Sequence, residues 1–139
     1  RLQNMGTPNY LISAALTLIM AQRLARKNCP ECSIIDENVT PKLLNAIGFL
    51  PEQSARAKIY KGKGCDQCGN TGFKGRMGIY EILEIDKELK HGILSDMSQV
   101  ELNAIAKKNG FRTMQEMGHD LLLSGDLCYS EFERVLQSS

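Results

Sequence analysis

The sequence predicts a mostly helical chain with a small β portion, in which a tetracysteine zinc knuckle is followed by a C-terminal helical bundle. Three observations carry this prediction. Two C-x2-C pairs supply four thiolates, the ligand set of a closed structural zinc site. Beyond residue 86, capping residues recur ahead of apolar runs, as helix starts require. Strand-like composition is confined to residues 57–61 and to the run that begins at Met77.

The first segment is predicted to form a helix that begins near Pro8, with Thr7 as its cap. From Leu11 to Leu24 the first half of the sequence is apolar nearly all round, which is typical of a buried helix. The uninterrupted apolar stretch is far shorter than the roughly 20 residues that span a membrane. The rest of the chain offers little that could surround such a helix, and Arg1 is not an initiator Met. We therefore expect a fragment of a larger protein.

Four cysteines, Cys29, Cys32, Cys65 and Cys68, are predicted to hold one structural Zn2+. Each C-x2-C hairpin places two thiolates within reach of one small ion, and four sulfurs leave no position for a catalytic water. The spacing between the pairs exceeds that of short zinc ribbons, so the site would pin back a long insertion. Two disulfides are the first alternative and would need an oxidising compartment, for which the sequence carries no secretory signal. An iron–sulfur cluster fits the ligand count, but two matched pairs favour zinc.

The stretch between the two cysteine pairs is predicted to hold one short helix and one short strand. Residues 33–38 are polar. Thr40 before Pro41 and a short apolar run marks a helix start, with Gly48 as the stop. Residues 57–61 are expected to form the strand. Glycines then surround the second cysteine pair, where backbone N–H groups must turn toward the sulfurs.

The C-terminal part is predicted to contain one strand and a small bundle of helices. The run from Met77 is rich in β-branched and aromatic residues, as strands are. Two later helices begin at the capping-box spacing, Ser98 with Glu101 and Thr113 with Glu116. Helices are expected over 87–95 with Asp86 as cap, from Ser98 to before Gly110, from Thr113 to Gly125, and over 130–136.

Charge and motif content exclude several classes of function. Lys plus Arg number 17 against 16 acidic residues, and a sequence-independent nucleic-acid binder needs a clear basic excess. The chain lacks both G-x-x-x-x-G-K-[ST] and G-x-G-x-x-G, so it carries no nucleotide-binding loop of its own. His91 and His119 fall in predicted helices away from the cysteine pairs, and Cys128 is predicted to be a packed thiol between apolar neighbours.

Arg76 is the candidate catalytic residue. It follows Lys74 and Gly75 and immediately precedes a predicted strand next to the zinc knuckle. A guanidinium on a rigid support suits planar recognition of phosphate or carboxylate. From the residues alone, however, a solvated surface arginine is the favoured interpretation.

Two ordered blocks of sequence resemble a known family. The first contains Arg1-Leu2, Met5-Gly6 and Ala21-Gln22-Arg23-Leu24-Ala25-Arg26, leading into Cys29 and Cys32. The second runs Gly64-Cys65-Asp66-Gln67-Cys68, Thr71-Gly72-Phe73-Lys74-Gly75-Arg76, Gly78-Ile79-Tyr80-Glu81-Ile82-Leu83, with Gly110-Phe111-Arg112-Thr113-Met114 and Gly125-Asp126 behind it. Together they resemble the C-terminal part of the type II secretion and type IV pilus assembly ATPases, over essentially the whole chain.

The resemblance implies a domain organisation and a set of roles. Residues 1–28 would end a RecA-like ATPase core, 29–76 would be the tetracysteine zinc subdomain, and 77–139 a returning strand with the C-terminal helical subdomain. The family's tetracysteine positions fall on the four cysteines named above. The arginine of its Gly-Arg-x-Gly-Ile segment falls on Arg76 and is implicated near the nucleotide phosphates. Arg23, in the Gln-Arg-Leu motif, is expected to be structural.

By the same resemblance, the intact protein would be a homo-hexamer that hydrolyses ATP with Mg2+ and drives pilin or pseudopilin polymerisation. Its expected partners are the upstream ATPase core of the same chain and an inner-membrane platform protein, with no nucleic acid. Its expected location is cytoplasmic, peripheral to the inner membrane. Because the phosphate-binding loop would lie upstream, the present chain alone is expected to be inactive.

Two rival functions remain open from the sequence. The segment Cys65-Asp66-Gln67-Cys68-Gly69-Asn70-Thr71-Gly72 resembles the zinc repeat of the J-domain co-chaperones, although Asn70 replaces one glycine and four repeats would be expected. The second rival is a zinc-ribbon nucleic-acid binding module, which the near-zero net charge disfavours. Residues 33–57 match no family pattern, so their role is open.

Overall fold

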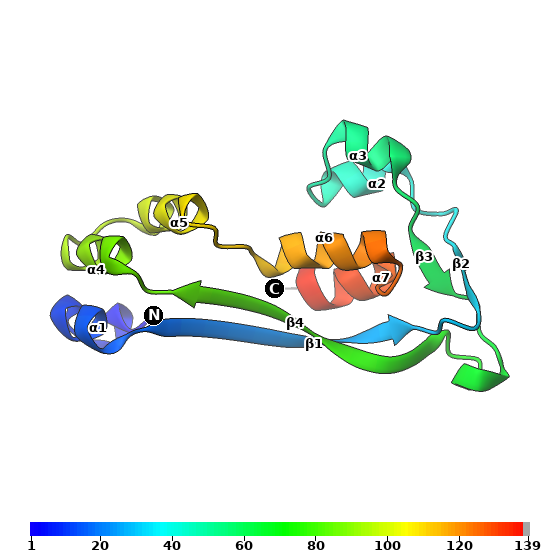
Figure 1. Cartoon of the computed structure of the whole chain (residues 1–139), viewed down its shortest axis with the longest axis horizontal. Helices are drawn as coiled ribbons and strands as arrows, with labels where there is room; N and C mark the ends of the chain where they lie inside the picture. The colour runs from blue at the N-terminus through cyan, green and yellow to red at the C-terminus, as the bar shows by residue number, and fades with distance from the viewer. Residues whose placement is uncertain (138–139) are drawn as a thin grey trace. The chain divides into compact units, whose positions relative to one another are not determined.

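The computed structural model describes residues 1–137 (Figure 1). Ten helical elements and four strands are present in this range, which confirms the prediction of a mostly helical chain with a smaller β portion. In chain order they are η1 (Gln3–Met5), α1 (Asn9–Ala15), β1 (Leu18–Asn28), β2 (Ser33–Ile35), α2 (Pro41–Ala46), α3 (Pro51–Arg56), β3 (Tyr60–Gly62), η2 (Asp66–Cys68), β4 (Phe73–Glu84), α4 (Lys87–Leu94), α5 (Gln99–Lys108), α6 (Met114–Ser124), α7 (Tyr129–Phe132) and η3 (Glu133–Gln137).

Two separate pairs of strands make up the β portion. The long strands β1 and β4 pair with each other and run in opposite directions (Figure 1). The short strands β2 and β3 form an antiparallel hairpin, in which Ser33 faces Gly62 and Ile35 faces Tyr60. β1 ends just before the first cysteine pair, and β4 begins just after the second. The paired strands therefore bring the two ends of the cysteine-containing segment close together.

Most of the predicted helix starts are confirmed. The Thr40 hydroxyl accepts a hydrogen bond from the Leu43 backbone N–H at 3.3 Å and caps α2. Asp86 caps α4 in the same way through the N–H of Leu89, at 2.8 Å. Ser98 opens α5 with the predicted capping box. Such side-chain oxygens satisfy backbone donors that the first turn of a helix leaves unpaired.

The prediction of one buried helix from Leu11 to Leu24 is wrong beyond Ala15. Leu16 takes an extended conformation, and the chain continues as the strand β1. Leu18, Ile19 and Met20 are 46–58% exposed in this chain, which agrees with the expectation that the rest of the chain offers little that could surround this segment. A run that is apolar on all sides does not distinguish a buried helix from a strand whose two faces are both apolar. The segment forms a strand rather than a helix because it pairs with β4, and this long-range pairing cannot be read from the local sequence.

Three smaller differences concern the region between the cysteine pairs. The polar stretch 33–38 contains the strand β2, for which no strand was predicted. The helix α3 was also not predicted, although Pro51 in its first turn and the reciprocal bond from Leu50 N–H to the Gln53 side chain are ordinary start signals. The strand predicted over 57–61 is shifted to β3, so that its last residue, Gly62, faces the hairpin partner.

The chain forms two compact units. The first comprises Arg1–Ala21 with Tyr80–Thr113, and the second Gln22–Ile79 with the chain from Met114 onward. Each has its own apolar core. That of the first unit centres on Ile85, Leu89 and Ala106. That of the second unit includes Leu44, Phe49, Ile59, Ile79, Leu122, Leu127 and Phe132.

The predicted domains 1–28, 29–76 and 77–139 come from the family resemblance, whereas the two units are defined by contacts within the chain. The domain division therefore stays a prediction. Within residues 1–137, no helix is both long enough and apolar enough to cross a membrane.

Candidate metal centre

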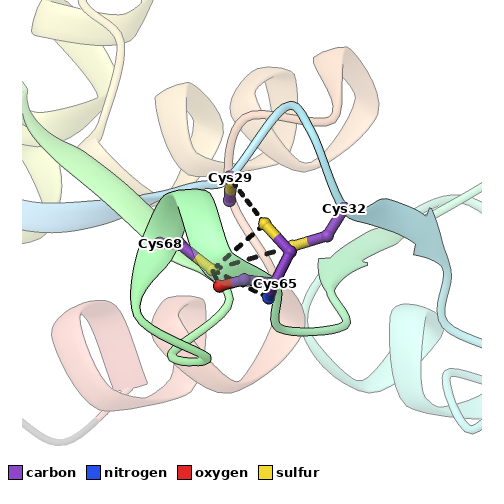
Figure 2. Close-up of side chains that lie close together, drawn as sticks. All are labelled: Cys29, Cys32, Cys65 and Cys68. Atoms are coloured by element: carbon purple, nitrogen blue, oxygen red, sulfur yellow. Dashed lines mark hydrogen bonds between the residues drawn. The ribbon is translucent and has the colours of Figure 1, made fainter.

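Four cysteine side chains from the two C-x2-C pairs converge in the second unit (Figure 2). Cys29 directly follows β1 and is fully buried, and Cys32 directly precedes β2. Cys65 directly precedes the single turn of η2, and Cys68 is its last residue. All four sulfurs lie within 4.8 Å of one another. The structure thus brings together the four residues that the sequence analysis named as metal ligands.

The sulfur–sulfur distances match those around a tetrahedral metal ion. Sγ of Cys65 lies 3.8 Å from that of Cys29 and 3.7 Å from that of Cys68. The Cys32–Cys68 distance is 3.9 Å. A Zn–S bond of about 2.3 Å places tetrahedral sulfurs about 3.8 Å apart. The donor set and its spacing therefore fit a four-coordinate ion such as Zn2+.

Disulfide bonding is absent from the structure described for residues 1–137. All five cysteines are free. The sulfur–sulfur distances given above far exceed the roughly 2.05 Å of a disulfide bond. The geometry therefore agrees with metal ligands rather than with the two disulfides considered as an alternative.

Backbone N–H groups point at the sulfurs. Gly64 donates to Cys32 Sγ at 3.3 Å, and Gly72 donates to Cys68 Sγ at 3.2 Å. The N–H of Cys65 also donates to Cys68 Sγ, at 3.3 Å. Such bonds stabilise the negative charge of thiolates and hold them in the orientation that a metal needs.

These hydrogen bonds act differently on two of the thiols. Burial opposes ionisation of Cys68, but the backbone N–H groups of Cys65 and Gly72, together with hydrogen bonds from the Cys65 and Cys32 thiols, outweigh burial and lower the pKa of Cys68 to about 6. Burial raises the pKa of Cys32 to about 11, against the single N–H bond from Gly64, because the neighbouring thiols add to the cost of its charge. A bound cation is what allows several adjacent thiolates to be charged together.

A close backbone crossing holds the two hairpins together. Gly72 has a φ of +80°, and its carbonyl oxygen accepts the N–H of Cys29 at 2.9 Å. A Cβ atom on Gly62 would meet the backbone of Gly72 directly. Only glycine allows this approach, so the glycines predicted around the second cysteine pair have an identifiable function.

Asn28 links the metal centre to the C-terminal helices, and the sequence analysis did not single it out. Its side chain is buried and donates to the carbonyl oxygens of Tyr60 at 3.1 Å and Gly125 at 2.9 Å. Its backbone N–H donates to the Asp126 carbonyl oxygen at 2.8 Å. The sequence feature that could have identified Asn28 is its position directly before Cys29, because the metal hairpin fixes the residue that leads into it.

Arg76 lies on β4, exposed, at a hollow of the second unit. Its side chain has no hydrogen bond or ion pair within residues 1–137. The residues that line the hollow are Leu24, Ala25, Arg26, Arg76 and Arg134, with no cysteine among them. The structure therefore places Arg76 with two other arginines, a grouping that the sequence analysis missed.

Glu131 is a second residue that the sequence analysis missed. Its carboxylate is 1% exposed and receives N–H groups from Arg26 and Arg134. Burial by itself would raise the pKa of Glu131, but the hydrogen bonds from Arg134 and Arg26 outweigh it and lower the pKa to about 2. Arg26 also stacks on Phe73, with its guanidinium carbon 4.1 Å from the ring centroid.

The other residues considered in the sequence analysis lie away from the four-cysteine cluster. Arg23 donates to the Val135 carbonyl oxygen, in line with the structural role expected of it. His119 packs between Phe49 and Phe132, with Nε2 2.8 Å from the Ile47 carbonyl oxygen, and His91 is an exposed residue of α4. Cys128 is a buried thiol 3.2 Å from the Ser130 hydroxyl, as predicted.

Comparison with known proteins gives consistent relatives. Residues 1–134 match the family described as "Type II/IV secretion system protein". The chain is 38% identical over 125 residues to the type IV pilus assembly ATPase PilB of Thermus thermophilus, and 36% identical over 135 residues to that of Pseudomonas aeruginosa. It is 30% identical over 135 residues to the type II secretion system protein E of Aeromonas hydrophila.

These alignments cover most of this chain but little of the relatives. They include 90%, 97% and 97% of the chain, against 14%, 24% and 26% of the three relatives in the same order. The chain thus spans about a quarter or less of the length of these proteins. The match favours the secretion ATPase interpretation over the co-chaperone and zinc-ribbon hypotheses. With 134 of its residues matched to the family, the chain belongs to the type II/IV secretion system proteins.

Proposed function

We propose that this chain is the C-terminal zinc-binding part of a hexameric ATPase that powers type IV pilus assembly or type II secretion. The observation that carries the proposal is the convergence of four cysteine sulfurs within a chain of this family. Relatives with the printed names pilus assembly ATPase and secretion system protein E support the cellular process. In the intact protein, ATP hydrolysis would drive the polymerisation of pilin or pseudopilin subunits.

In this proposal Cys29, Cys32, Cys65 and Cys68 hold a structural Zn2+. The ion supplies cross-linking rather than catalysis, because four protein ligands leave no open position. Structural zinc contributes roughly 10–16 kcal/mol of apparent binding free energy in small domains, enough to order hairpins with few apolar residues. The two hairpins hold the ends of β1 and β4 and thereby fix the strands on which Arg26 and Arg76 lie.

Arg76 is proposed to act at the nucleotide. It is exposed and unpaired within residues 1–137, so its five N–H donors are available to an anion. A guanidinium near the phosphates would stabilise negative charge that develops during phosphoryl transfer. ATP and Mg2+ would be bound by another part of the intact protein, because this chain has no phosphate-binding loop.

The proposed partners follow from the same function. The intact protein would assemble as a homo-hexamer on the cytoplasmic side of the inner membrane and act on a membrane platform protein. The zinc-stabilised region would stiffen an arm that contacts the platform protein or a neighbouring subunit. Exposed apolar residues between the cysteine pairs, Ile34, Ile35, Leu43 and Leu50, offer such a contact surface.

The test uses the intact protein with and without its metal ligands. Cys65→Ser should lower zinc content, ATP turnover and filament assembly in cells, whereas Cys128→Ser should leave all three near the wild-type values because Cys128 is not a ligand. The present chain alone should not hydrolyse ATP. Full assembly activity in a zinc-free Cys65→Ser protein, or ATP hydrolysis by the chain alone, would contradict the proposal.

A further inference from the structure

The hairpin of β2 and β3 (Figure 1) leaves one edge of β2 open. Within residues 1–137, β2 pairs with β3 and with no other strand. In an antiparallel pair, alternate residues direct their backbone N–H and C=O groups at the partner strand, and the residues between them direct theirs away. One set of β2 residues therefore has its backbone groups at an edge that no strand covers.

Two hydrogen bonds that flank β2 identify the two sets. The Lys63 N–H donates to the Cys32 carbonyl oxygen at 2.9 Å, and the Asp36 N–H donates to the Ile59 carbonyl oxygen at 2.8 Å. Cys32 and Asp36 thus have their backbone groups on the β3 side, and the alternation gives Ile34 the same side. The residues on either side of Ile34 direct their backbone groups outward.

Ser33 and Ile35 are these outward-facing residues. Their N–H and C=O groups have no backbone partner within residues 1–137. On β3, by contrast, the outward-facing Tyr60 is occupied, because its carbonyl oxygen accepts a hydrogen bond from the Asn28 side chain at 3.1 Å. The open edge of the hairpin is thus that of β2. An unpaired edge strand is a template onto which another extended chain can add.

A hollow of about 610 Å³ borders this edge. Ile34 and Ile35 both line it, and they are 41% and 47% exposed. Removal of this apolar surface from water favours the binding of a segment that brings an apolar side chain of its own. The lining residues are Ser33, Ile34, Ile35, Glu37, Asn38, Tyr60 and Lys61.

Both ends of the open edge carry negative charge. Glu37 lines the hollow and Glu31 precedes β2, and both are exposed. Neither carboxylate has a hydrogen bond or ion pair within residues 1–137. Lys61, which also lines the hollow, lies 3.5 Å from the carboxylate of Asp36 and is neutralised by it. The surface therefore favours an occupant with basic side chains at its two ends.

A second copy of the chain does not have this chemistry. Two copies of β2 related by a two-fold axis pair antiparallel, which brings the Glu31 end of each strand toward the Glu37 end of the other. Both contacts join like charges, which destabilise a pair of strands. Charged residues are a common means by which edge strands avoid pairing with themselves.

We propose that the open edge of β2 binds an extended segment of a partner protein, in which apolar residues lie between two basic residues. The N–H and C=O groups of Ser33 and Ile35 bond to the backbone of the segment. The hollow takes an apolar side chain, and Glu31 and Glu37 face the basic ends. The inference deepens the contact surface proposed above for Ile34 and Ile35, and it rests on that proposal.

The experiment titrates the zinc-loaded chain with the end-capped peptide Lys-Thr-Val-Thr-Val-Thr-Lys at low ionic strength and follows the backbone amide signals by NMR. The signals of β2 should shift with a dissociation constant in the millimolar range, and hydrogen exchange at Ser33 and Ile35 should slow. Exchange at Ile34 should change little, because its N–H is already directed at β3. The same peptide with Glu in place of both Lys should bind about tenfold more weakly.

N-methylated peptides test the backbone pairing directly. Methylation of one alternate set of peptide nitrogens should abolish binding, and methylation of the other set should not, because only one set directs its N–H groups at β2.

Variants of the chain locate the binding surface. Glu37→Lys should weaken binding of the Lys peptide about fivefold and strengthen binding of the Glu peptide, since it reverses the charge at one end of the edge. Ile35→Thr keeps a β-branched side chain on the strand but removes apolar surface from the hollow, so it should also weaken binding. Leu50→Thr, at an exposed apolar position outside the hollow, should not.

The absence of any shift at β2, equal binding of the Lys and Glu peptides, or equal effects of Ile35→Thr and Leu50→Thr would overturn the inference. Self-association of the chain in sedimentation that Ile35→Thr abolishes would assign the edge to a second copy and would overturn it as well. None of these results bears on zinc content or ATP turnover, so failure here is distinguishable from failure of the proposed function.

Discussion

Arg26 and Glu131 join the strand before the metal centre to the helix α7: Arg26 Nη2 lies 2.7 Å from Glu131 Oε1, and the Arg26 backbone N–H lies 2.8 Å from Oε2. The two residues are far apart in sequence, and one belongs to β1 while the other belongs to α7. A buried carboxylate that is fully hydrogen-bonded fixes one geometry and is costly to leave unpaired. The contact therefore makes the second unit sensitive to the charge of a single residue.

Acidification should expose this sensitivity. The folded-state pKa of Glu131 is about 2, below its ordinary value of 4.5. The unfolded chain therefore takes up the proton first, and the stabilisation is complete above about pH 4.5 and is lost as the pH falls toward 2. The shift corresponds to a contribution on the order of 3 kcal/mol to the free energy of unfolding at neutral pH. Urea unfolding of wild type and Glu131→Gln should differ by this amount at pH 7.

The control for acid effects elsewhere is Glu37→Gln, an exposed carboxylate between β2 and α2. Its free energy of unfolding should follow that of wild type within about 0.5 kcal/mol at every pH. Acid-induced loss of metal would affect all three proteins alike. A wild-type advantage over Glu131→Gln that stays constant down to pH 2 would show that ionisation of Glu131 is not the source of stability.

The crossing of Gly62 and Gly72 should tolerate no side chain. A Cβ on Gly62 would overlap the Gly72 carbonyl oxygen and lie 2.5 Å from the Gly72 carbonyl carbon. Both are backbone atoms, so the clash cannot be relieved by rotating a side chain. Gly62→Ala should therefore lower the free energy of unfolding by about 3 kcal/mol and weaken metal retention. Gly69→Ala is the comparison, since a Cβ at this position meets nothing within 4 Å. Its only cost is that of an alanine at a φ of +62°, which lowers the free energy of unfolding by about 1 kcal/mol. Equal losses in urea unfolding would refute a role for the crossing.

The sequence predicted those features that depend on local chemistry. The caps at Thr40, Asp86 and Ser98 are read from neighbouring residues, and the structure confirms them. Each C-x2-C pair is equally local, since it brings its own two sulfurs together, and the preference of zinc for four ligands predicted that the two pairs would meet. The strand β1 was missed because its apolar run is compatible with a helix, and only pairing with β4 decides between them. Asn28 and Glu131 were missed for the same reason, because Asn28 bonds to Gly125 and Glu131 to Arg26, partners that lie 97 and 105 residues away.

Metal removal should act first on the second unit. The purified chain should contain one Zn2+, and Cys65→Ser or a strong chelator should remove it. Hydrogen exchange should then increase at the N–H groups of Asn28 and Cys29, which are bonded to Asp126 and Gly72. The helix α5, whose core residue Ala106 packs in the first unit, should keep its protection.

Cys128→Ser provides the matched control for that experiment, because the fifth cysteine lies outside the cluster. It should retain one Zn2+ per chain and the wild-type exchange pattern near Cys29. A zinc content well below one, together with four thiols that react freely in the folded chain, would defeat the assignment of a structural metal centre.

Arg76 gives the sharpest test of function in the intact protein. If its guanidinium contacts the nucleotide phosphates, Arg76→Ala should lower ATP turnover about a hundredfold, as loss of one preorganised donor does. Arg76→Lys should recover little of this, because a compact ammonium group on a flexible chain does not reproduce a planar two-point contact. Zinc content and hexamer assembly should stay unchanged, since the Arg76 side chain makes no hydrogen bond or ion pair within residues 1–137. Lys74→Ala removes an exposed charge two residues earlier on β4 and should leave turnover near normal. Near-normal turnover in both Arg76 variants would leave a zinc-stabilised scaffold as the function of this chain.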